Sequence, residues 1–205
     1  MLIVAIAGGS GSGKTSVANQ LCTALSEIEF SCTNLCEDSY YYSLNEAQLE
    51  NVSAYNFDHP DAINHAQLMA HLDLLKQGLA IEAPTYCYKT HQQLDSTITM
   101  TPADVFVLEG LHLLHREHLL PFYDHTIFVD TPTQVRLDRR INRDVRERQR
   151  TIESVTQQFY QTVEPSHAEF IQPSKVNAHT VVDGTQPLDD FMPDIIQTVL
   201  NKLSR

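Results

Sequence analysis

The 205-residue chain is 42% hydrophobic and 20% charged, and it carries a formal net charge of −12 at pH 7. This composition is typical of a globular protein with one complete core, so we expect a single domain over residues 1–205. The acidic balance argues against general binding of nucleic acid or anionic membranes. The sequence contains no apolar run of 18 residues, so we expect no membrane span.

The chain begins with an apolar run at residues 2–7, which predicts a buried strand, and helical spacing follows at residues 16–25. Between them lies Gly-Gly-Ser-Gly-Ser-Gly-Lys-Thr, a complete G-x-x-x-x-G-K-[ST] phosphate-binding loop. Backbone N–H groups of such a loop face the phosphates, Lys14 reaches the β- and γ-phosphates, and the Thr15 hydroxyl ligates Mg²⁺. We therefore predict a nucleoside triphosphate site. Its expected residues are Gly8, Gly9, Ser10, Gly11, Ser12, Gly13, Lys14, Thr15 and Ser16.

Residues 31–36 predict a second strand, which Asp38 follows closely. A carboxylate at this place can accept a proton from an attacking hydroxyl group or coordinate Mg²⁺. The alternative is a turn-forming aspartate at the surface. The nearby phosphate loop favours the functional interpretation.

A polar segment at residues 56–61 precedes a helical pattern at residues 62–77. Asp61 is expected to cap the start of that helix. Asp58 has no evident structural duty, which makes it a candidate for binding sugar hydroxyl groups.

Residues 81–101 predict a β-hairpin that projects from the main sheet, because short alternating segments there flank a polar turn. The next apolar strand, at residues 105–108, ends at Glu109. P-loop enzymes hold their metal with an acid after an apolar strand, so Glu109 is a candidate metal ligand. The alternative is an acid that caps a helix.

Further apolar runs at residues 126–129 and 180–182 alternate with helical patterns. This alternation predicts an α/β fold with a parallel sheet covered on both faces. Ligands of such sheets bind beyond the carboxyl ends of the strands. Residues 188–203 predict a helix that packs on the sheet, with Pro193 marking a break or an early-turn position. The expected strand ends carry Gly8, Asp38, Glu109 and Asp130.

Seven of the fourteen basic residues lie at residues 136–150, within or just after a helical pattern at residues 133–147. Four of them share one helix face and two follow the helix: Arg136, Arg139, Arg140 and Arg143, then Arg148 and Arg150. A solvated basic face is the alternative, but in an acidic chain that binds polyphosphate we favour a lid over the phosphates. The lid is expected at about residues 136–158. Like charges predict that residues 139–150 are mobile until phosphates bind.

The four cysteines form no C-x-x-C pair, and we expect buried, reduced thiols. Three histidines recur at residues 112, 115 and 118. This spacing spreads around a helix and lacks the carboxylate of H-E-x-x-H, so ordinary histidines are favoured over a zinc site.

Taken together, the motifs resemble those of the uridine kinases (uridine–cytidine kinases) within the P-loop kinases, over about residues 3–182. The motifs occur in the family's order. They are Gly-Gly-Ser-Gly-Ser-Gly-Lys-Thr (8–15), Glu-Asp-Ser-Tyr-Tyr (37–41), Asn-Phe-Asp-His-Pro-Asp-Ala (56–62), residues 86–91, Leu-Glu-Gly (108–110), Phe-Val-Asp-Thr (128–131) and Arg-Arg-Ile-Asn-Arg-Asp-Val-Arg-Glu-Arg (139–148).

The resemblance implies Mg²⁺-dependent transfer of phosphate from ATP or GTP to the 5′-hydroxyl of a pyrimidine nucleoside. It implies that Asp38 is the base and that Thr15 and Glu109, with Asp38, form the metal site. Lys14, Arg140 and Arg143 are implied to assist the transfer. The implied substrate contacts are Tyr41, Asp58, Tyr86, Tyr88, His91, Arg140, Arg148, Arg150 and Gln158. Of these, Asp58 matches the ribose contact, Tyr86 with His91 the pair that reads the pyrimidine edge, and Tyr88 an aromatic beside the base. Family members are usually cytoplasmic homotetramers with feedback from CTP.

Several positions depart from the family's pattern, namely Cys87, Gln92, Gln93, Gln149 and Asp183. They leave base preference, donor preference and feedback open. The main alternative is a phosphoribulokinase-like sugar kinase, from which His91 and the hairpin tyrosines would separate the chain, because a sugar phosphate offers no base. A GTPase would need an Asn-Lys-x-Asp motif, and Asn201-Lys202-Leu203-Ser204 lacks the aspartate.

Overall fold

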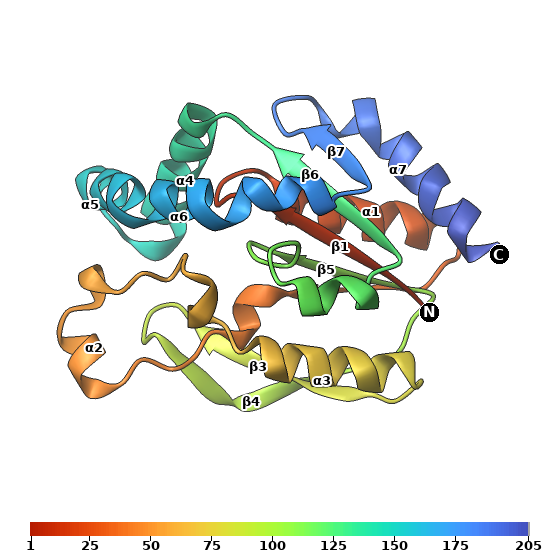
Figure 1. Cartoon of the computed structure of the whole chain (residues 1–205), viewed down its shortest axis with the longest axis horizontal. Helices are drawn as coiled ribbons and strands as arrows, with labels where there is room; N and C mark the ends of the chain where they lie inside the picture. Colours follow the sequence, from red (N-terminus) through yellow and green to blue (C-terminus); the bar gives the residue numbers. More distant parts are fainter. Residues whose placement is uncertain (205) are drawn as a thin grey trace.

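The computed structural model describes residues 1–204, apart from the side chain of Ser53. A parallel five-stranded sheet with the order β2-β5-β1-β6-β7 forms its centre (Figure 1). The strands are β1 (Leu2–Gly8), β2 (Cys32–Cys36), β5 (Val105–Gly110), β6 (His125–Asp130) and β7 (Thr180–Asp183). The predicted α/β fold with a parallel sheet is confirmed.

The sheet separates two hydrophobic cores, and the side chains of the central strand β1 alternate between them. Ile3, Ala5 and Ala7 face the core that includes α3 (His65–Lys76). The alternate residues of β1 face a core made with α1 (Lys14–Glu27) and α7 (Leu188–Leu203). The prediction that the terminal helix packs on the sheet is thus confirmed. Of the two expectations for Pro193, a break is wrong, because the helix runs through it; the residue lies in the second turn of α7.

The α3 helix starts later than expected, and Asp61 does not cap it. Asn64 is the cap, because its side chain accepts a hydrogen bond from the Gln67 N–H at 3.0 Å. Asp61 lies instead in a short 3₁₀ turn, Pro60–Ala62, and pairs with Arg116 at 2.5 Å. The extended backbone of Ile63 separates this turn from α3, which the helical spacing alone did not reveal.

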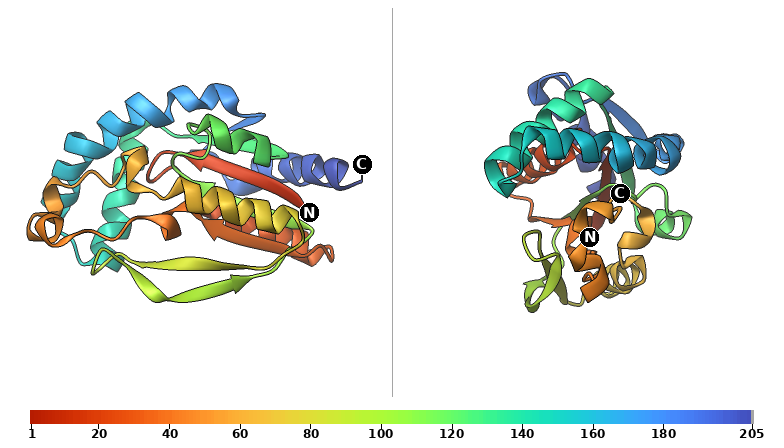
Figure 2. Two further views of the ribbon diagram at one scale, coloured as in Figure 1. Left: turned by 60° about the horizontal axis from the view of Figure 1, so that its bottom comes forward. Right: turned by 90° about the vertical axis from the view of Figure 1, so that its left-hand side faces the viewer.

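The hairpin is formed by β3 (Ile81–Cys87) and β4 (Gln92–Met100), an antiparallel pair that hydrogen bonds with no strand of the main sheet in residues 1–204. Figure 2 shows it running beside α3, away from the sheet. The connection after β2 contains a 3₁₀ turn (Glu37–Tyr40) and the short helix α2 (Glu46–Glu50). These segments and the hairpin lie on the same side of the molecule.

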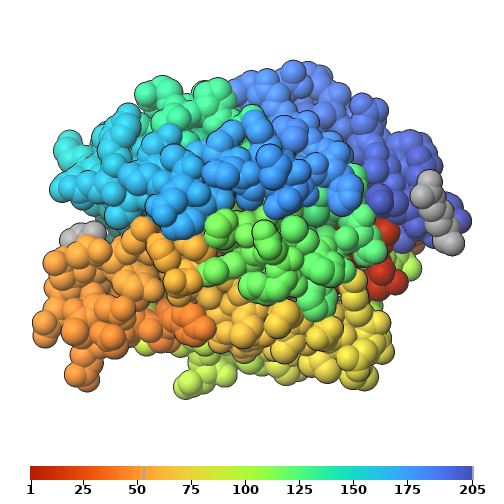
Figure 3. All heavy atoms as spheres, in the orientation of Figure 1, coloured from red at the N-terminus to blue at the C-terminus, as the bar shows by residue number. Residues whose placement is uncertain are grey.

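The region predicted as a lid consists of α4 (Thr133–Arg148) and α5 (Ile152–Gln158), joined by a sharp turn. Irregular helix follows through α6 (Glu164–Ser166) to Ile171. Figure 3 shows residues 150–175, in cyan and blue, above residues 40–75, in orange and yellow. None of the helices in residues 1–204 combines the length and the apolar character needed to cross a membrane.

Two of the four cysteines, Cys22 and Cys32, form a disulfide between α1 and β2, whereas reduced thiols were expected. Helix α1 packs beside β2 so that the two Cα atoms lie 5.1 Å apart, within the range of natural disulfides. This proximity arises from helix packing and has no signature in the spacing of the cysteines. Cys36 and Cys87 are free and only partly buried.

Candidate active site

The phosphate loop lies where predicted, between β1 and α1. Its backbone turns through left-handed conformations at Gly11 and Gly13, with φ of 80° and 102°. A side chain at Gly11 would also collide with the backbone of Arg136 at the start of the lid helix α4. The glycines therefore allow both the tight turn and the close approach of the lid.

Beside the loop is a cavity of about 530 Å³. Phosphate-loop residues and three arginines of α4 line one part of it, and a segment after β7 lines the other. Arg139 joins the two parts by donating to the Ser12 carbonyl at 3.0 Å and to the Gly184 carbonyl at 2.9 Å. The sequence analysis missed the apolar end of this cavity, formed by Pro187, Leu188 and Phe191. The apolar residues of α7 indicated only that this helix packs on the sheet, so their place beside the cavity was not predicted.

Glu109, at the carboxyl end of β5, is brought next to the phosphate loop. Its Oε1 accepts a hydrogen bond from the Thr15 hydroxyl at 2.9 Å, and its Oε2 lies 3.9 Å from the Lys14 ammonium. The side chain is 3% exposed, and no residue in the described range 1–204 donates a hydrogen bond to Oε2. A buried carboxylate oxygen beside a hydroxyl suits Mg²⁺, which usually takes one or two carboxylates and completes its shell with phosphates and water.

Asp130, the fourth expected strand-end residue, does not join this group. Its carboxylate accepts a hydrogen bond from Lys175 at 3.0 Å, and Asp130 lies beside Asp183 at the end of β7. The strand order explains the difference, because β6 lies on the opposite side of β1 from β5 and so carries Asp130 away from Glu109.

Asp38 lies in the 3₁₀ turn that follows β2. Loss of hydration raises the pKa of its carboxyl group; the positive charge of Lys14 opposes this effect and the negative charge of Glu109 adds to it. A carboxylate with a raised pKa binds a proton more readily than an ordinary aspartate. This property suits a general base.

The pH dependence of the reaction is expected to reflect this shift. A base acts only when deprotonated, so kcat/KM should fall as the pH drops through the pKa of Asp38. Because that pKa is raised, the acidic limb should lie above the ordinary aspartate value of 3.8. A pH profile of kcat/KM measures the limb, and a midpoint at the ordinary value would contradict the assignment.

The buried carboxylate of Glu37 holds the Asp38 turn in place. It is fully buried, it pairs with His65 at 2.8 Å, and its Oε2 accepts the backbone N–H of His112 at 2.9 Å. Burial opposes ionisation of Glu37, but the contacts with His65 and His112 outweigh it and lower the pKa of its carboxyl group. The ionised carboxylate therefore ties the Asp38 turn to α3 and to the segment after β5.

Replacing Gly110 by alanine should displace this anchor. A methyl group at Gly110 would overlap both the carboxylate and the Cβ atom of Glu37. Rotating the Glu37 carboxylate cannot remove the overlap with Cβ, so the backbone of one of the two segments has to move. Overpacking of a rigid core costs typically about 1–3 kcal/mol. We expect lower stability in thermal unfolding together with lower kcat. Unchanged kcat would mean that Glu37 moves without moving Asp38.

An aromatic cluster joins the hairpin to the Asp38 side of the site. The Tyr41 ring contacts those of Phe57 and Tyr86, with centroids 6.0 and 5.4 Å apart, and Phe57 stacks on His91 at 5.0 Å. The Tyr86 hydroxyl and His91 Nδ1 are buried without a hydrogen-bond partner in the described part of the chain. The sequence analysis missed the contact of Phe57 with His91, although Phe57 lies inside the motif that contains Asp58.

Four of the lid arginines meet at one buried carboxylate, that of Asp144, which is 0% exposed. Arg143 donates to it at 2.8 Å, and Arg140, Arg148 and Arg150 lie 3.6 to 3.8 Å from it. The chain returns Arg150 to this point because Gln149 adopts a left-handed conformation, with φ of 56°. The sequence analysis gave Asp144 no role. Its negative charge offsets the repulsion on which the expected mobility of residues 139–150 was based, and that mobility stays a prediction.

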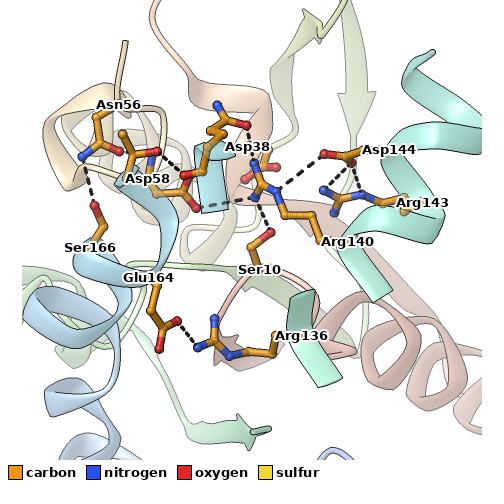
Figure 4. A network of polar contacts seen from close by, with 12 residues as sticks. Ser10, Asp38, Asn56, Asp58, Arg136, Arg140, Arg143, Asp144, Glu164 and Ser166 are labelled. Carbon is orange, nitrogen blue, oxygen red and sulfur yellow. Dashed lines mark hydrogen bonds and ion pairs between the residues drawn. The ribbon is translucent and has the colours of Figure 1, made fainter. Parts of the chain in front are cut away.

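Arg140 occupies the middle of the site. Its guanidinium donates to the Ser10 hydroxyl at 2.7 Å and to the Gln158 side chain at 3.1 Å, and it lies 3.9 Å from Asp58. Figure 4 shows Arg140 between the phosphate loop, Asp58 and Asp144. Gln158 also accepts a hydrogen bond from Arg150. The predicted residues Asp58, Arg140, Arg143, Arg148, Arg150 and Gln158 are thus brought together.

Arg136, by contrast, does not face the phosphates with the other arginines. It is buried, pairs with Glu164 at 2.5 Å and donates to the Thr131 carbonyl at 3.1 Å. Figure 4 shows this pair apart from the Asp144 cluster. Helical spacing placed Arg136 on the same face as Arg139, Arg140 and Arg143. However, α6 packs over the start of α4 and buries Arg136.

A phosphate-binding loop at the carboxyl end of a central parallel strand, facing arginines of a lid helix, defines the class of P-loop phosphotransferases. Residues 3–189 match the model of the phosphoribulokinase / uridine kinase family. The chain belongs to this family and is a kinase.

Curated relatives agree with this assignment. The chain is 41% identical over 181 residues to a uridine kinase of Halalkalibacterium halodurans, covering 88% of the chain and 85% of that protein. It is 40% identical over 185 residues to a uridine kinase of Vibrio cholerae, covering 88% and 86%. It is 38% identical over 201 residues to uridine kinase-like protein 5 of Arabidopsis thaliana, covering 98% of the chain but only 43% of that longer protein.

Solved structures support the fold. A structure described as a possible uridine kinase from Bacillus stearothermophilus superposes with a TM-score of 0.66 at 21% identity, covering 89% of this chain and 88% of that one. Phosphoribulokinase from Rhodobacter spheroides gives a TM-score of 0.63 at 14% identity, covering 91% and 73%. At these identities the likeness concerns the fold alone.

Proposed function

We propose that the protein transfers the γ-phosphate of ATP or GTP to the 5′-hydroxyl of uridine or cytidine, forming UMP or CMP in pyrimidine salvage. The relatives named as uridine kinases at about 40% identity support this substrate class. The structural observation that carries the proposal is the pair of buried polar atoms without partners in the hairpin cluster, the Tyr86 hydroxyl and His91 Nδ1.

These two atoms suit the edge of a pyrimidine. A buried polar group without a hydrogen bond costs free energy, so unpaired groups in a cleft suggest a ligand that satisfies them. A tyrosine hydroxyl donates and accepts, and histidine donates or accepts according to its tautomer. The Phe57 ring against His91 adds an apolar surface for a flat base.

The remaining residues can carry out the transfer. Asp38 would take the proton of the attacking hydroxyl, and Lys14 with Arg140 and Arg143 would balance the charge of the phosphates. Asp58 would hold the ribose hydroxyls. Thr15 and Glu109, with Asp38 nearby, would hold Mg²⁺, which supplies charge neutralisation of the phosphates. The Asp144 cluster would bring Arg148 and Arg150 over the site and help to exclude water.

We further propose that the protein works in the cytoplasm as a homo-oligomer, as its resemblance to the uridine kinases implies. Light scattering of the purified protein measures the oligomeric state. A monomer at micromolar concentration would contradict this part of the proposal.

A screen of acceptors tests the proposed reaction. Purified protein with Mg²⁺ and ATP should release ADP in the presence of uridine or cytidine, with UMP or CMP identified by chromatography. The alternative is a phosphoribulokinase-like sugar kinase. Turnover of a sugar phosphate, with none of either nucleoside, would show that the alternative is right.

Replacing His91 by alanine should impair nucleoside use specifically. The change removes the Nδ1 group and the stack on Phe57, so kcat/KM for uridine should fall by roughly 10- to 100-fold, as expected for one buried polar contact. The affinity for an ATP analogue should not change, because the hairpin lies apart from the phosphate loop. Equal losses toward both ligands would instead indicate a misfolded hairpin.

A further inference from the structure

Tyr88, the first residue of the hairpin turn after β3, contacts the candidate base directly. Its hydroxyl donates a hydrogen bond to Asp38 Oδ2 at 3.2 Å. The sequence resemblance implied only that its ring lies beside the nucleobase. The structure therefore gives the hydroxyl group of Tyr88 a contact that a role in stacking does not require.

The ring of Tyr88 is held from two sides. The guanidinium of Arg148 lies over it, 4.4 Å from its centroid, and Tyr86 meets it edge to face at 5.5 Å. Arg148 belongs to the lid and lies 3.7 Å from Asp144. The phenol thus connects the hairpin, the lid and the Asp38 turn.

The phenol is also a proton donor that stays protonated. A tyrosine hydroxyl is a donor at neutral pH, so it makes this contact without any change of ionisation. An alcohol that attacks the γ-phosphate must donate its proton to the same carboxylate. A water molecule in the acceptor site can also donate its proton to Asp38, and the donor nucleotide is then hydrolysed without phosphorylation of an acceptor.

We propose that the Tyr88 hydroxyl stands in for the acceptor hydroxyl on Asp38 and suppresses hydrolysis of the donor nucleotide until a nucleoside displaces it. The inference rests on the proposed nucleoside kinase function. In the suppressed side reaction, water oxygen bonds to the γ-phosphorus and the bond to the β-phosphate oxygen breaks. Asp38 receives the proton, and the products are ADP and orthophosphate.

The competing explanation is that Tyr88 serves only as a stacking surface for the nucleobase. Stacking against the base requires the ring of Tyr88 but not its hydroxyl group. Because the residue is 40% exposed, water could satisfy the hydroxyl in that case. In the structure the hydroxyl faces the carboxylate instead. The arrangement Arg148–Tyr88–Asp38 also gives the lid a means of holding the phenol in place.

Tyr88→Phe tests the inference, because it keeps the ring and its contact with Arg148 while removing the donor. ATP hydrolysis without nucleoside should rise by roughly 10- to 100-fold, in line with the loss of one hydrogen bond to a charged group. KM for uridine should fall, because no resident donor competes with the 5′-hydroxyl. Tyr42→Phe is the matched control: this tyrosine is exposed and lies outside the aromatic cluster.

Hydrolysis equal to that of the wild type would overturn the proposal, and so would a raised KM with unchanged hydrolysis, which would make the hydroxyl a substrate contact. The hydrolysis assay contains no acceptor, so it stays informative even if the true acceptor is a sugar. Should the variant fail to fold, ¹³C-tyrosine NMR of the wild type replaces it. The Tyr88 signal should move toward that of a solvated phenol on addition of uridine, and an unmoved signal would overturn the proposal.

Discussion

Asp38→Asn is expected to lower kcat by about 10²–10⁴, the usual contribution of a general base. Asparagine has the same shape and can still accept the hydrogen bond from Tyr88, but it cannot take a proton from the acceptor. Steady-state assays of UMP formation with saturating ATP measure the change.

Stability provides the control for this variant. The raised pKa of Asp38 means that the fold disfavours its charged form, so this charge lowers stability at neutral pH. The neutral asparagine should therefore leave the melting temperature unchanged or raise it, with the affinity for an ATP analogue retained. A variant with near-normal kcat would assign Asp38 a structural role.

Arg140→Ala is expected to lower both kcat and stability. An arginine that contacts the transferring phosphoryl group can contribute about 10³–10⁵ in kcat. Arg140 also lies between the buried carboxylates of Asp58 and Asp144. Removing one partner of a buried ion pair costs roughly 3–5 kcal/mol. Urea unfolding and steady-state kinetics measure the two effects separately.

Arg146→Ala is the matched control on the same helix. Arg146 is 80% exposed and pairs only with its exposed neighbour Glu147 in the described residues. Pairs of this kind contribute little, so activity and stability should both stay close to those of the wild type. If Arg140→Ala behaved like this control, the lid cluster would have no part in the transfer.

Local signals in the sequence were sufficient for most of the fold. The three central strands of the main sheet contain short apolar runs bounded by polar or glycine residues, and β1 and β5 are buried along their whole length. The order of such runs and helical patterns determines a parallel sheet, and a parallel sheet collects its strand ends at one edge. The proximity of Lys14, Thr15 and Glu109 follows from this rule.

Features that depend on packing between distant segments were not predictable in this way. In the sequence, Asp144 and Arg136 are each one charged residue among many on the same helix. In the structure, Asp144 binds four arginines, whereas Arg136 is buried beneath α6. The Cys22–Cys32 disulfide likewise depends on how α1 packs on β2. In each case the deciding contact is made across the fold, where single-sequence periodicity carries no information.

The separateness of the hairpin has a consequence for how this architecture can diversify. Since β3 and β4 form their own two-stranded sheet, residues there can change without disturbing the ladder that aligns the phosphate loop with Glu109. On the assignment proposed above, recognition of the acceptor belongs to the hairpin and chemistry on the donor to the main sheet, two units that can vary independently. A family that includes both phosphoribulokinases and uridine kinases is what such modular construction allows. Exchanging the hairpin is thus a rational route to new acceptor specificity.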